Sequence, residues 1–517
     1  MGVDLGSTSL KAIVYDTRGR VVASGSRATE KCHPSAEHPE WAVWQPEQIW
    51  NGTAAAIRDA LARLDDPGKL RGVAVTGMGM DGLPVDAEGD WLYPFISWHD
   101  PSTAAQFEWW KQHVGLEKTA SIAGNPVWPI NSALRILWFA EHEPALFART
   151  DKWLLIEDFV NFMLCGRRVT DYSMASCALL FDQRALDWSE ELLGLSGIPR
   201  RLLCDALPSG TPLGTIHAAA ARATGLPEGT PLILGGHDHL CGALPVGAFR
   251  PGVILDVTGT WESVLTATPQ PVLDCRLPRM GMTVQAHVAR GMHVVWGGNP
   301  AGDMIEWFRR HFGTTIGDAG DWSSLVAAAA ASPPGARRVL FLPHLSAAGC
   351  PMVDPRSLGA FVGLSNLVTP GDMLRAVIEG LDYQFLDIVA SMEDVLAACG
   401  VMAAGHPLPR IVAVGGATRN AFWMQNKADV TGRPIEVPDI EEATPLGAAI
   451  LAGIGLGIYR DEQDAFERTY RPGKVYEPDP RLSAQYADGF SIYRTLYPAL
   501  APISHRLDRR CSDSESG

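Results

Sequence analysis

The chain has 517 residues and a formal net charge of -15, with 46% hydrophobic and 20% charged residues. This length exceeds what one ordinary hydrophobic core supports, so we expect at least two domains, and the composition excludes bulk disorder. The acidic balance argues against broad binding to nucleic acids or anionic membranes, because such partners require a positive field.

The cysteines predict an intracellular, reducing setting. Nine cysteines are scattered along the chain without a Cys-x-x-Cys pair. Neither a disulfide framework nor a structural zinc site is therefore indicated. We also expect no signal peptide at the start and no membrane-spanning helix, since the longest nearly apolar run, at residues 447–459, is shorter than a bilayer. The expected location is the cytoplasm.

The first 25 residues predict three strands joined by short turns. Alternating apolar residues such as Ala12 and Val14 indicate the second strand, and the polar segment DLGST occupies the first corner at residues 4–8. A segment that starts at Gly252 has a similar outline, with DVTGT at residues 256–260 in the equivalent place. We interpret the two segments as copies of one structural device.

Helical patterns alternate with buried-strand patterns along the rest of the chain. Helices are expected at 46–64, 145–164, 190–203 and 370–398, and buried strands at 72–76 and 410–414. This alternation predicts an α/β protein with mixed sheets flanked by helices. Prolines and glycines at 245–252 indicate a boundary there, which gives an N-terminal lobe at 1–246, a C-terminal lobe at 247–503 and a flexible tail at 504–517.

The two duplicated loops are candidates for phosphate binding. A Gly-Ser-Thr loop after a strand offers backbone N–H groups and hydroxyls to phosphate oxygens, and Asp4 at the strand end could hold Mg²⁺ through water. The alternative is a polar hairpin closed by a buried aspartate. Two such loops facing each other across a cleft would hold a triphosphate from both sides, so the duplication favours phosphate binding.

Asp238 is the candidate for acid–base chemistry. It follows an apolar strand and two glycines, in the segment GGHDH, and precedes a helix of small residues. A carboxylate in this position could accept a proton from an attacking hydroxyl, or it could merely cap the helix. The flanking His237 and His239 do not predict a metal site, because the sequence offers no third ligand beside them.

A further glycine turn is a candidate nucleotide site. Gly415 and Gly416 follow a buried strand and precede a helix, where small residues allow adenosine to lie close to the backbone. A simple tight turn is the alternative. This turn does not fit the dinucleotide fingerprint, because Gly-x-Gly-x-x-Gly is absent from it, and the Walker A motif is absent from the whole sequence, which argues against a P-loop kinase.

Three polar residues near a tryptophan are candidates for sugar recognition. Asp81 follows the strand at 72–76, and His99 and Asp100 follow Trp98. Their side chains could hydrogen-bond sugar hydroxyls while the indole covers an apolar sugar face. Ordinary loop capping is the alternative for each of them, and Asp171 is expected to cap or orient a turn.

Several of these motifs, taken in order, resemble the FGGY carbohydrate kinase family, and most closely its L-fuculokinase-like, xylulokinase-related members. They include DLGSTSLKA, GGHDHLCGA, TGTWES, GGATRNAFWMQNKADVTGRPIEVP and EEATPLGAAILAG. The resemblance covers nearly the whole chain. It implies two ribonuclease-H-like lobes of the actin-like ATPase type, with ATP in the cleft between them and the sugar held mainly by the first lobe.

The resemblance also implies roles for individual residues: Asp238 as catalytic base and substrate contact, Asp4 as the Mg²⁺ ligand and Asp81 as a sugar ligand. It implies phosphate contacts at Ser7, Thr8, Gly259 and Thr260, and adenosine contacts at Gly415, Gly416, Ala417 and Asn420. The sequence departs from the family pattern where residues 347–350 read AAGC in place of Gly-Glu-Arg. This departure leaves the subfamily open.

The expected function is ATP-dependent phosphorylation of a primary hydroxyl of a small ketose such as L-fuculose or xylulose. Kinases of another pentose or a polyol are alternatives within the same family. A non-sugar actin-like ATPase would retain both phosphate loops but would not need Asp238. The sequence does not fix the oligomeric state, and a homodimer is compatible with it.

Overall fold

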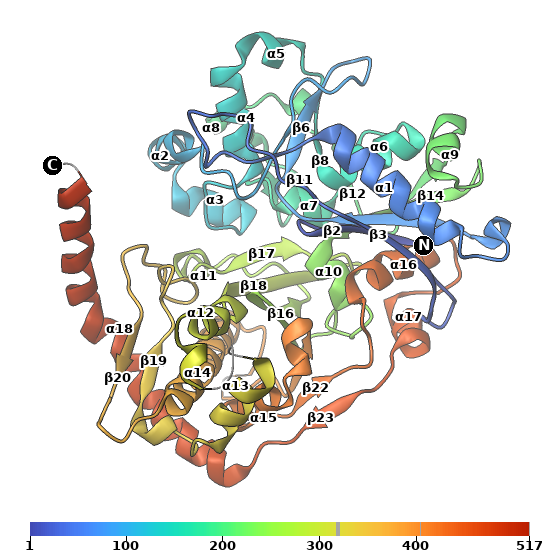
Figure 1. Cartoon of the computed structure of the whole chain (residues 1–517). Helices are drawn as coiled ribbons and strands as arrows, with labels where there is room; N and C mark the ends of the chain where they lie inside the picture. The colour runs from blue at the N-terminus through green and yellow to red at the C-terminus, as the bar shows by residue number, and fades with distance from the viewer. Residues whose placement is uncertain (317–320, 404, 516–517) are drawn as a thin grey trace.

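The computed structural model describes residues 1–316, 321–403 and 405–515, with side chains described up to residue 508. The chain forms two lobes, drawn one above the other in Figure 1, with a mixed β-sheet in each. Together the two sheets confirm the expected α/β class.

The sheet of the first lobe has six strands. Its order is β13 (Pro212–Thr215), β14 (Pro231–His237), β5 (Val73–Gly77), β1 (Gly2–Leu5), β2 (Ser9–Tyr15) and β3 (Val21–Ala28). Strand β1 pairs antiparallel with β2 and parallel with β5, and β5 pairs parallel with β14. The carboxyl ends of β1, β5 and β14 therefore meet at one edge of the sheet.

The sheet of the second lobe has seven strands and repeats this arrangement. Its order is β17 (Thr283–Ala286), β18 (His293–Pro300), β16 (Trp261–Thr268), β15 (Val253–Thr258), β21 (Arg410–Val414), β22 (Ile435–Val437) and β23 (Lys474–Tyr476). Strand β15 pairs antiparallel with β16 and parallel with β21, as β1 does with β2 and β5. The hairpins that carry DLGST and DVTGT therefore occupy equivalent places in the two sheets.

Helices cover the sheets in both lobes (Figure 1). In the first lobe they are α1 (Pro46–Leu61), α2 (Ala104–His113), α3 (Leu116–Ala123), α4 (Ser132–His142), α5 (Pro144–Arg149), α6 (Ile156–Cys165), α7 (Tyr172–Ser176), α8 (Glu190–Ser196), α9 (Ala218–Thr224) and α10 (Asp238–Ala243). In the second part of the chain they are α11 (Arg276–Arg279), α12 (Gly302–Phe312), α13 (Trp322–Ala331), α14 (Pro370–Ala398), α15 (Ala421–Thr431), α16 (Ala443–Gly455), α17 (Glu462–Thr469) and α18 (Pro480–Glu515). No helix within these described ranges is long and apolar enough to cross a membrane.

Helix α14 confirms the expected helix at 370–398, and local chemistry explains its start. The hydroxyl of Thr369 accepts from the amide of Asp372 at 3.3 Å, while the Asp372 carboxylate accepts from the amide of Thr369 at 2.8 Å. This reciprocal capping box satisfies two amides that the helix leaves unpaired. Pro370 suits the first turn because it has no N–H to lose.

The expected helix at 145–164 is wrong as a single element. The structure divides it into α5, the strand β8 (Lys152–Leu155) and α6. Strand β8 pairs antiparallel with β6 (Gly82–Val85) in a four-stranded sheet that also contains β4 (Val43–Trp44) and β7 (Phe95–Ile96). Pairing with a distant strand and burial of Trp153 and Leu154 override the local periodicity.

Short strands in two-stranded pairs complete the β-structure. The pairs are β9 (Val169–Asp171) with β12 (Asp205–Leu207), β10 (Phe181–Asp182) with β11 (Asp187–Trp188), and β19 (Leu340–Leu342) with β20 (Ala360–Val362). Residues 504–515, expected to be a flexible tail, continue α18, and the last two residues of that tail lie outside the described residues. The predicted lobe boundaries remain a prediction.

Helix α16 joins the two lobes although it comes from the C-terminal part of the chain. It packs against β1, β5 and β14 of the first sheet and against α10. A β-carbon on Gly447 would overlap the carbonyl oxygen of Cys241, and one on Gly242 would lie 3.2 Å from the hydroxyl of Thr444. A shared apolar cluster, which includes Leu240, Leu255 and Ile450, fills the space between the lobes at this point.

Replacement of Gly447 by alanine should therefore destabilise the protein. The added methyl group has to displace backbone, which costs about 1–3 kcal/mol. This cost exceeds the gain of roughly 0.5–1 kcal/mol that alanine brings in a helix interior. We expect a lower midpoint in thermal unfolding.

Gly194→Ala is the matched control, because Gly194 also lies in a helix but a β-carbon added to it would meet no described atom within 4 Å. This control should unfold at or slightly above the temperature of the unmodified protein. Equal unfolding temperatures for Gly447→Ala and Gly194→Ala would contradict the close approach of α16 and α10.

Candidate active site

The first phosphate-loop candidate connects β1 and β2 and is held by the end of β3. The amide of Gly6 donates to the Ser9 carbonyl at 3.1 Å, and the hydroxyl of Thr29 donates to the Gly6 carbonyl at 2.7 Å. Ser7 is half-buried, whereas the side chain of Thr8 is exposed. The backbone of this loop is thus fixed while its polar groups remain open to the cleft.

The second candidate loop connects β15 and β16 and is braced by the start of α12. The amide of Gly302 donates to the Gly259 carbonyl at 2.9 Å, and the amide of Ala301 donates to the Thr260 carbonyl at 3.0 Å. Thr260 itself is exposed. Both predicted loops therefore exist, and each is anchored to a neighbouring element.

The two aspartates at the strand ends differ in chemistry, which the similarity of the two loop sequences did not reveal. Asp256 is fully buried, and its carboxylate lies 2.6 Å from the ammonium group of Lys427 on α15. Lys427 also contacts Glu262 at 2.5 Å. Burial opposes the charge on this ammonium, but the surrounding carboxylates outweigh burial and raise the pKa of Lys427. Asp256 is therefore held inside an ion-pair network.

Asp4 forms no such ion pair among the residues that the structure describes. Lys11, which lies opposite Asp4 on β2, is bound by Glu442 at 2.8 Å. Burial raises the pKa of Asp4 to about 7, and the negative charges of Asp238 and Glu442 add to this effect while Lys11 opposes it. A carboxylate with unneutralised charge at the end of β1 suits a divalent cation, since hard cations prefer oxygen ligands.

Asp238 begins α10 at the end of β14, on the same sheet edge as Asp4. Its side chain is 33% exposed, and its Oδ1 accepts from the amide of His239 at 2.6 Å. The imidazole Nδ1 of His239 lies 3.3 Å from the same oxygen. Burial opposes ionisation of Asp238, but the hydrogen bonds from His239 outweigh it and keep the pKa of Asp238 below its ordinary value.

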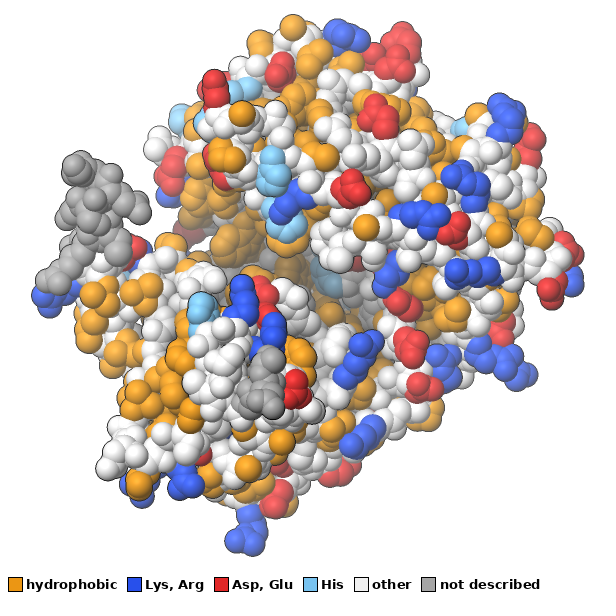
Figure 2. Space-filling model, viewed as in Figure 1, with side chains coloured by type: hydrophobic (Ala, Val, Ile, Leu, Met, Phe, Trp, Pro, Cys, Tyr) orange, Lys and Arg blue, Asp and Glu red, His pale blue; other side chains and the backbone are white. Residues whose placement is uncertain are grey.

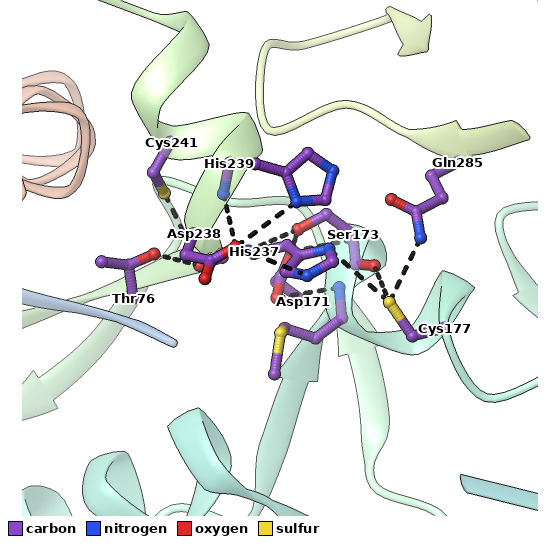
Figure 3. Close-up of polar contacts among 11 residues, drawn as sticks. Thr76, Asp171, Ser173, Cys177, His237, Asp238, His239, Cys241 and Gln285 are labelled. Carbon is purple, nitrogen blue, oxygen red and sulfur yellow. Dashed lines mark hydrogen bonds and ion pairs between the residues drawn. The ribbon is translucent and has the colours of Figure 1, made fainter. Parts of the chain in front are cut away.

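The turn that carries Asp238 is fixed by a buried polar network (Figure 3). The amide of His237 donates to the hydroxyl of Ser173 at 2.9 Å, and that hydroxyl donates to Asp171. Asp171 also caps α7, as the sequence predicts. On the other side, the hydroxyl of Thr76 donates to the carbonyl of Gly236 at 2.6 Å.

The second lobe contributes to this network through β17. The side-chain amide of Gln285 donates to Cys177 at 3.2 Å, and Cys177 lies 3.6 Å from Nδ1 of His237 (Figure 3). Burial lowers the pKa of His237 to about 3, so this imidazole is neutral. The ring of His239 lies 5.0 Å from that of Trp296 on β18. Residues of both lobes therefore meet around Asp238.

The glycine turn after β21 lies against the second phosphate-loop candidate. Gly415 has a φ of 105°, and a β-carbon on it would overlap the carbonyl oxygen of Thr258. Only glycine fits this combination of conformation and close approach. Gly416 is exposed, and Ala417 follows it in a short 3₁₀ turn. Asn420 caps α15, where its side chain accepts from the amide of Trp423 at 3.1 Å.

The three predicted sugar residues fall into two groups. Asp81 is fully buried, and its two oxygens accept from Trp44 at 2.7 Å and from Arg135 at 2.9 Å. Asp100 is 3% exposed and accepts from the backbone amides of Ala42 and Ser102. Both carboxylates thus hold the first lobe together internally, and direct contact with a sugar remains a prediction for them.

His99 is exposed and stacks on Trp98, with ring centroids 3.7 Å apart. Arg135, which sequence reasoning missed, contacts Asp81 and also donates to the carbonyls of Met80 and Ile96 at 3.0 and 2.7 Å. It therefore ties together the two loops that carry the predicted sugar residues. The pairing has no signal in the sequence, because its members come from distant segments.

A cavity of about 740 Å³ opens between the lobes beside the second phosphate-loop candidate. Figure 2 shows the molecule hollowed between its upper and lower halves. Aromatic side chains from both lobes line it, among them Phe107, Trp128 and Trp261. Residues 347–349, where the sequence departs from the family pattern, line it as well. Sequence reasoning identified neither Trp128 nor Trp261 as part of a cavity wall.

Comparison with known proteins places this geometry in context. The chain is 31% identical over 469 residues to an L-fuculokinase of Salmonella typhi, covering 90% of this chain and 93% of the relative. It is 29% identical over 513 residues to a xylulose kinase of Klebsiella pneumoniae, with coverage of 97% and 99%. The crystal structure of a xylulose kinase from Rhodospirillum rubrum superposes with a TM-score of 0.87 at 30% identity, covering 98% of this chain and 99% of the other.

The family models agree with these relatives. The N-terminal domain model of the FGGY family of carbohydrate kinases matches residues 1–245, and its C-terminal domain model matches residues 256–456. Kinases of this family use ATP, and the two-lobed α/β fold is the one expected from the sequence. The alternative of a non-sugar ATPase is thereby removed. The chain belongs to the FGGY family of carbohydrate kinases, enzymes that transfer a phosphoryl group to an alcohol group of their substrate.

Proposed function

We propose that this kinase phosphorylates a primary hydroxyl of a small ketose and that Asp238 is the catalytic base. The observation that carries the proposal is the placement of Asp238, which lies at the carboxyl end of β14 beside Asp4 and is held ionised by His239. Similar identity to an L-fuculokinase and a xylulose kinase supports a ketose, since both relatives are named for one.

The chemistry follows from the two oxygens of Asp238. His239 engages Oδ1, so Oδ2 is the atom that takes the proton from the substrate hydroxyl. The hydroxyl oxygen then forms its bond to the γ-phosphorus of ATP as the bond to ADP breaks. The neutral His237 and the buried Ser173 hold the turn, so that the carboxylate does not have to reorganise during the reaction.

The two loops are proposed to hold the phosphate groups from opposite sides. Backbone N–H groups and the hydroxyls of Ser7, Thr8 and Thr260, with the backbone of Gly259, are the proposed contacts. Asp4 is proposed to hold Mg²⁺, which neutralises charge on the transferring phosphoryl group when it is bound. The free carboxylate and raised pKa of Asp4 fit this role, whereas Asp256 is already neutralised by Lys427.

The turn at Gly415 and Gly416 is proposed to lie against adenosine, together with Ala417 and Asn420. Its contact with Thr258 supports this, because it joins the turn to the second phosphate loop. On the sugar side, His99 and Trp98 are proposed as contacts. Asp81 and Asp100 are proposed to shape this side from within, with Asp81 acting through Arg135.

Asp238→Asn should lower kcat by roughly 10²–10⁴, because the amide keeps the shape of the side chain but cannot accept the proton. Affinity for ATP should change little. Steady-state kinetics and equilibrium nucleotide binding measure the two effects. Asp488→Asn, a change of an exposed aspartate on α18, is the control. Turnover near that of the unmodified enzyme would contradict the role of Asp238 as base and favour the alternative that it only caps the helix.

Asp4→Asn should stabilise the nucleotide-free protein at pH 8 but not at pH 4. The pKa of Asp4 is raised from 3.8 to about 7, so the folded state binds the proton more tightly than the unfolded state does. The free energy of unfolding therefore falls as pH rises through this window, and asparagine removes the fall. A shift of about 3 pKa units corresponds to at most about 4 kcal/mol, and we expect a part of this gain at pH 8, measured by denaturant unfolding.

The same variant should lose most of its turnover and show a changed Mg²⁺ dependence, since it lacks the proposed metal ligand. Equal destabilisation at both pH values would contradict the electrostatic cause assigned to Asp4. Unchanged Mg²⁺ dependence would instead contradict its role as a metal ligand.

A substrate panel should show the highest kcat/KM for ketoses such as L-fuculose or D- and L-xylulose, with glycerol poor. Polar groups that meet specific hydroxyls reject analogues lacking them more strongly than an apolar wall does. Coupled ADP assays and NMR mapping of each product are the measurements. Efficient phosphorylation of glycerol or of an aldose, with no ketose turned over, would overturn the ketose assignment but leave the kinase family unchanged.

A further inference from the structure

Three consecutive residues at the junction of β14 and α10 bring nitrogen and oxygen ligands together. Nε2 of His237 lies 3.6 Å from Oδ1 of Asp238, and Nδ1 of His239 lies 3.3 Å from the same oxygen. One ligand atom from each residue lies within 4.8 Å of the others. The sequence offered only the two histidines as ligands; the structure adds the carboxylate between them.

The two separations from Oδ1, 3.6 and 3.3 Å, are close to those that a tetrahedral ion imposes. Ligand atoms at about 2.0–2.1 Å from Zn²⁺ lie about 3.3 Å from one another. Two imidazoles and one carboxylate form an N₂O set, which favours Zn²⁺, Co²⁺ or Ni²⁺ over Mg²⁺ and Ca²⁺, because the latter prefer oxygen. With three protein ligands, the fourth position would remain open to water or to a substrate hydroxyl.

The surroundings hold one of the two imidazoles at its second nitrogen and pack the ring of the other. A metal-binding imidazole usually has its other nitrogen held by a second group, which fixes the ring. Here Cys177 lies 3.6 Å from Nδ1 of His237 and is itself held by Gln285. The ring of His239 packs near Trp296. The side chain of Asp238 is 33% exposed, so an ion can reach it from the cleft.

We propose that His237, Asp238 and His239 form an inhibitory site for a late first-row divalent cation such as Zn²⁺, distinct from the Mg²⁺ that accompanies ATP. An ion bound to Oδ1 would withdraw electron density from the carboxylate and so make Oδ2 a poorer proton acceptor. Binding itself depends only on the geometry, whereas inhibition rests on the proposed role of Asp238 as base.

Metal binding is measured on the full-length protein without nucleotide or sugar. Co²⁺ is the probe, since its visible absorption reports a site of low coordination number, and Zn²⁺ is added to displace it. We expect one equivalent to bind, and His239→Gln and His237→Gln each to weaken binding at least tenfold. His113→Gln, which removes an exposed histidine from α2, is the matched control and should bind as the unmodified protein does.

His239→Gln is the more informative variant, because His237 is buried and its replacement risks the fold. Absence of Co²⁺ binding, or binding equal in both variants and the control, would overturn the site. Inhibition is then measured with Mg-ATP in excess at buffered Zn²⁺ concentrations, each variant being compared with its own uninhibited rate. We expect the Zn²⁺ concentration for half inhibition to rise at least tenfold in His239→Gln.

The two assays separate failure of the site from failure of the proposed function. Co²⁺ bound at the histidines without inhibition by Zn²⁺ would overturn the inhibitory role and count against Asp238 as base. An enzyme that turns over no ketose would contradict the proposed substrate, while the Co²⁺ titration would still decide whether the metal site exists.

Discussion

Burial of Asp4, at the sheet edge that also carries Asp238, is the constraint around which this side of the first lobe is organised. Strands β1 and β14 flank β5 in parallel, so their carboxyl ends place both carboxylates at one sheet edge. Burial disfavours the ionised form of a carboxylate, and a second negative charge in the same region adds to this effect. Hydrogen bonds from His239 keep the pKa of Asp238 low, whereas the pKa of Asp4 is raised, mainly by burial and less by the charge of Asp238. A positive charge bound near Asp4 would therefore favour the ionised form of its carboxylate.

In the second lobe, the equivalent aspartate is neutralised by a buried lysine. Lys427 enters the sheet from α15 and pairs with both Asp256 and Glu262, all three groups being almost completely buried. A buried pair contributes little net stability, but loss of one partner leaves an unpaired charge and costs several kcal/mol. The equivalent aspartates of the two hairpins therefore differ: Asp256 is paired with Lys427, whereas Asp4 has no ion-pair partner among the described residues.

Local patterns predicted most of the framework, and distant contacts account for the errors. Alternation and glycine turns located the two hairpins, and the helical pattern at 370–398 located α14. The strand β8 was missed because its pairing partner, β6, lies far earlier in the chain. Asp81 was predicted to be a sugar ligand, which stays a prediction, and its burial against Arg135 could not be foreseen, since nothing in the sequence links the two. Likewise, Lys427 is an ordinary helix residue in the sequence until the fold places it beside Asp256.

The side chains that line the cavity between the lobes indicate which kind of substrate fits it. Two charged side chains of the first lobe are already paired: Arg135 with Asp81 and Lys11 with Glu442. The cavity between the lobes is lined mostly by apolar side chains, among them Trp128 and Trp261 from opposite lobes, together with residues 347–349. An uncharged ligand with hydroxyls on one side and carbon on the other suits such walls, because indoles cover apolar sugar faces. The small residues at 347–349 add volume where a larger motif is typical of the family, so selectivity is expected to differ among relatives at this wall rather than at Asp238.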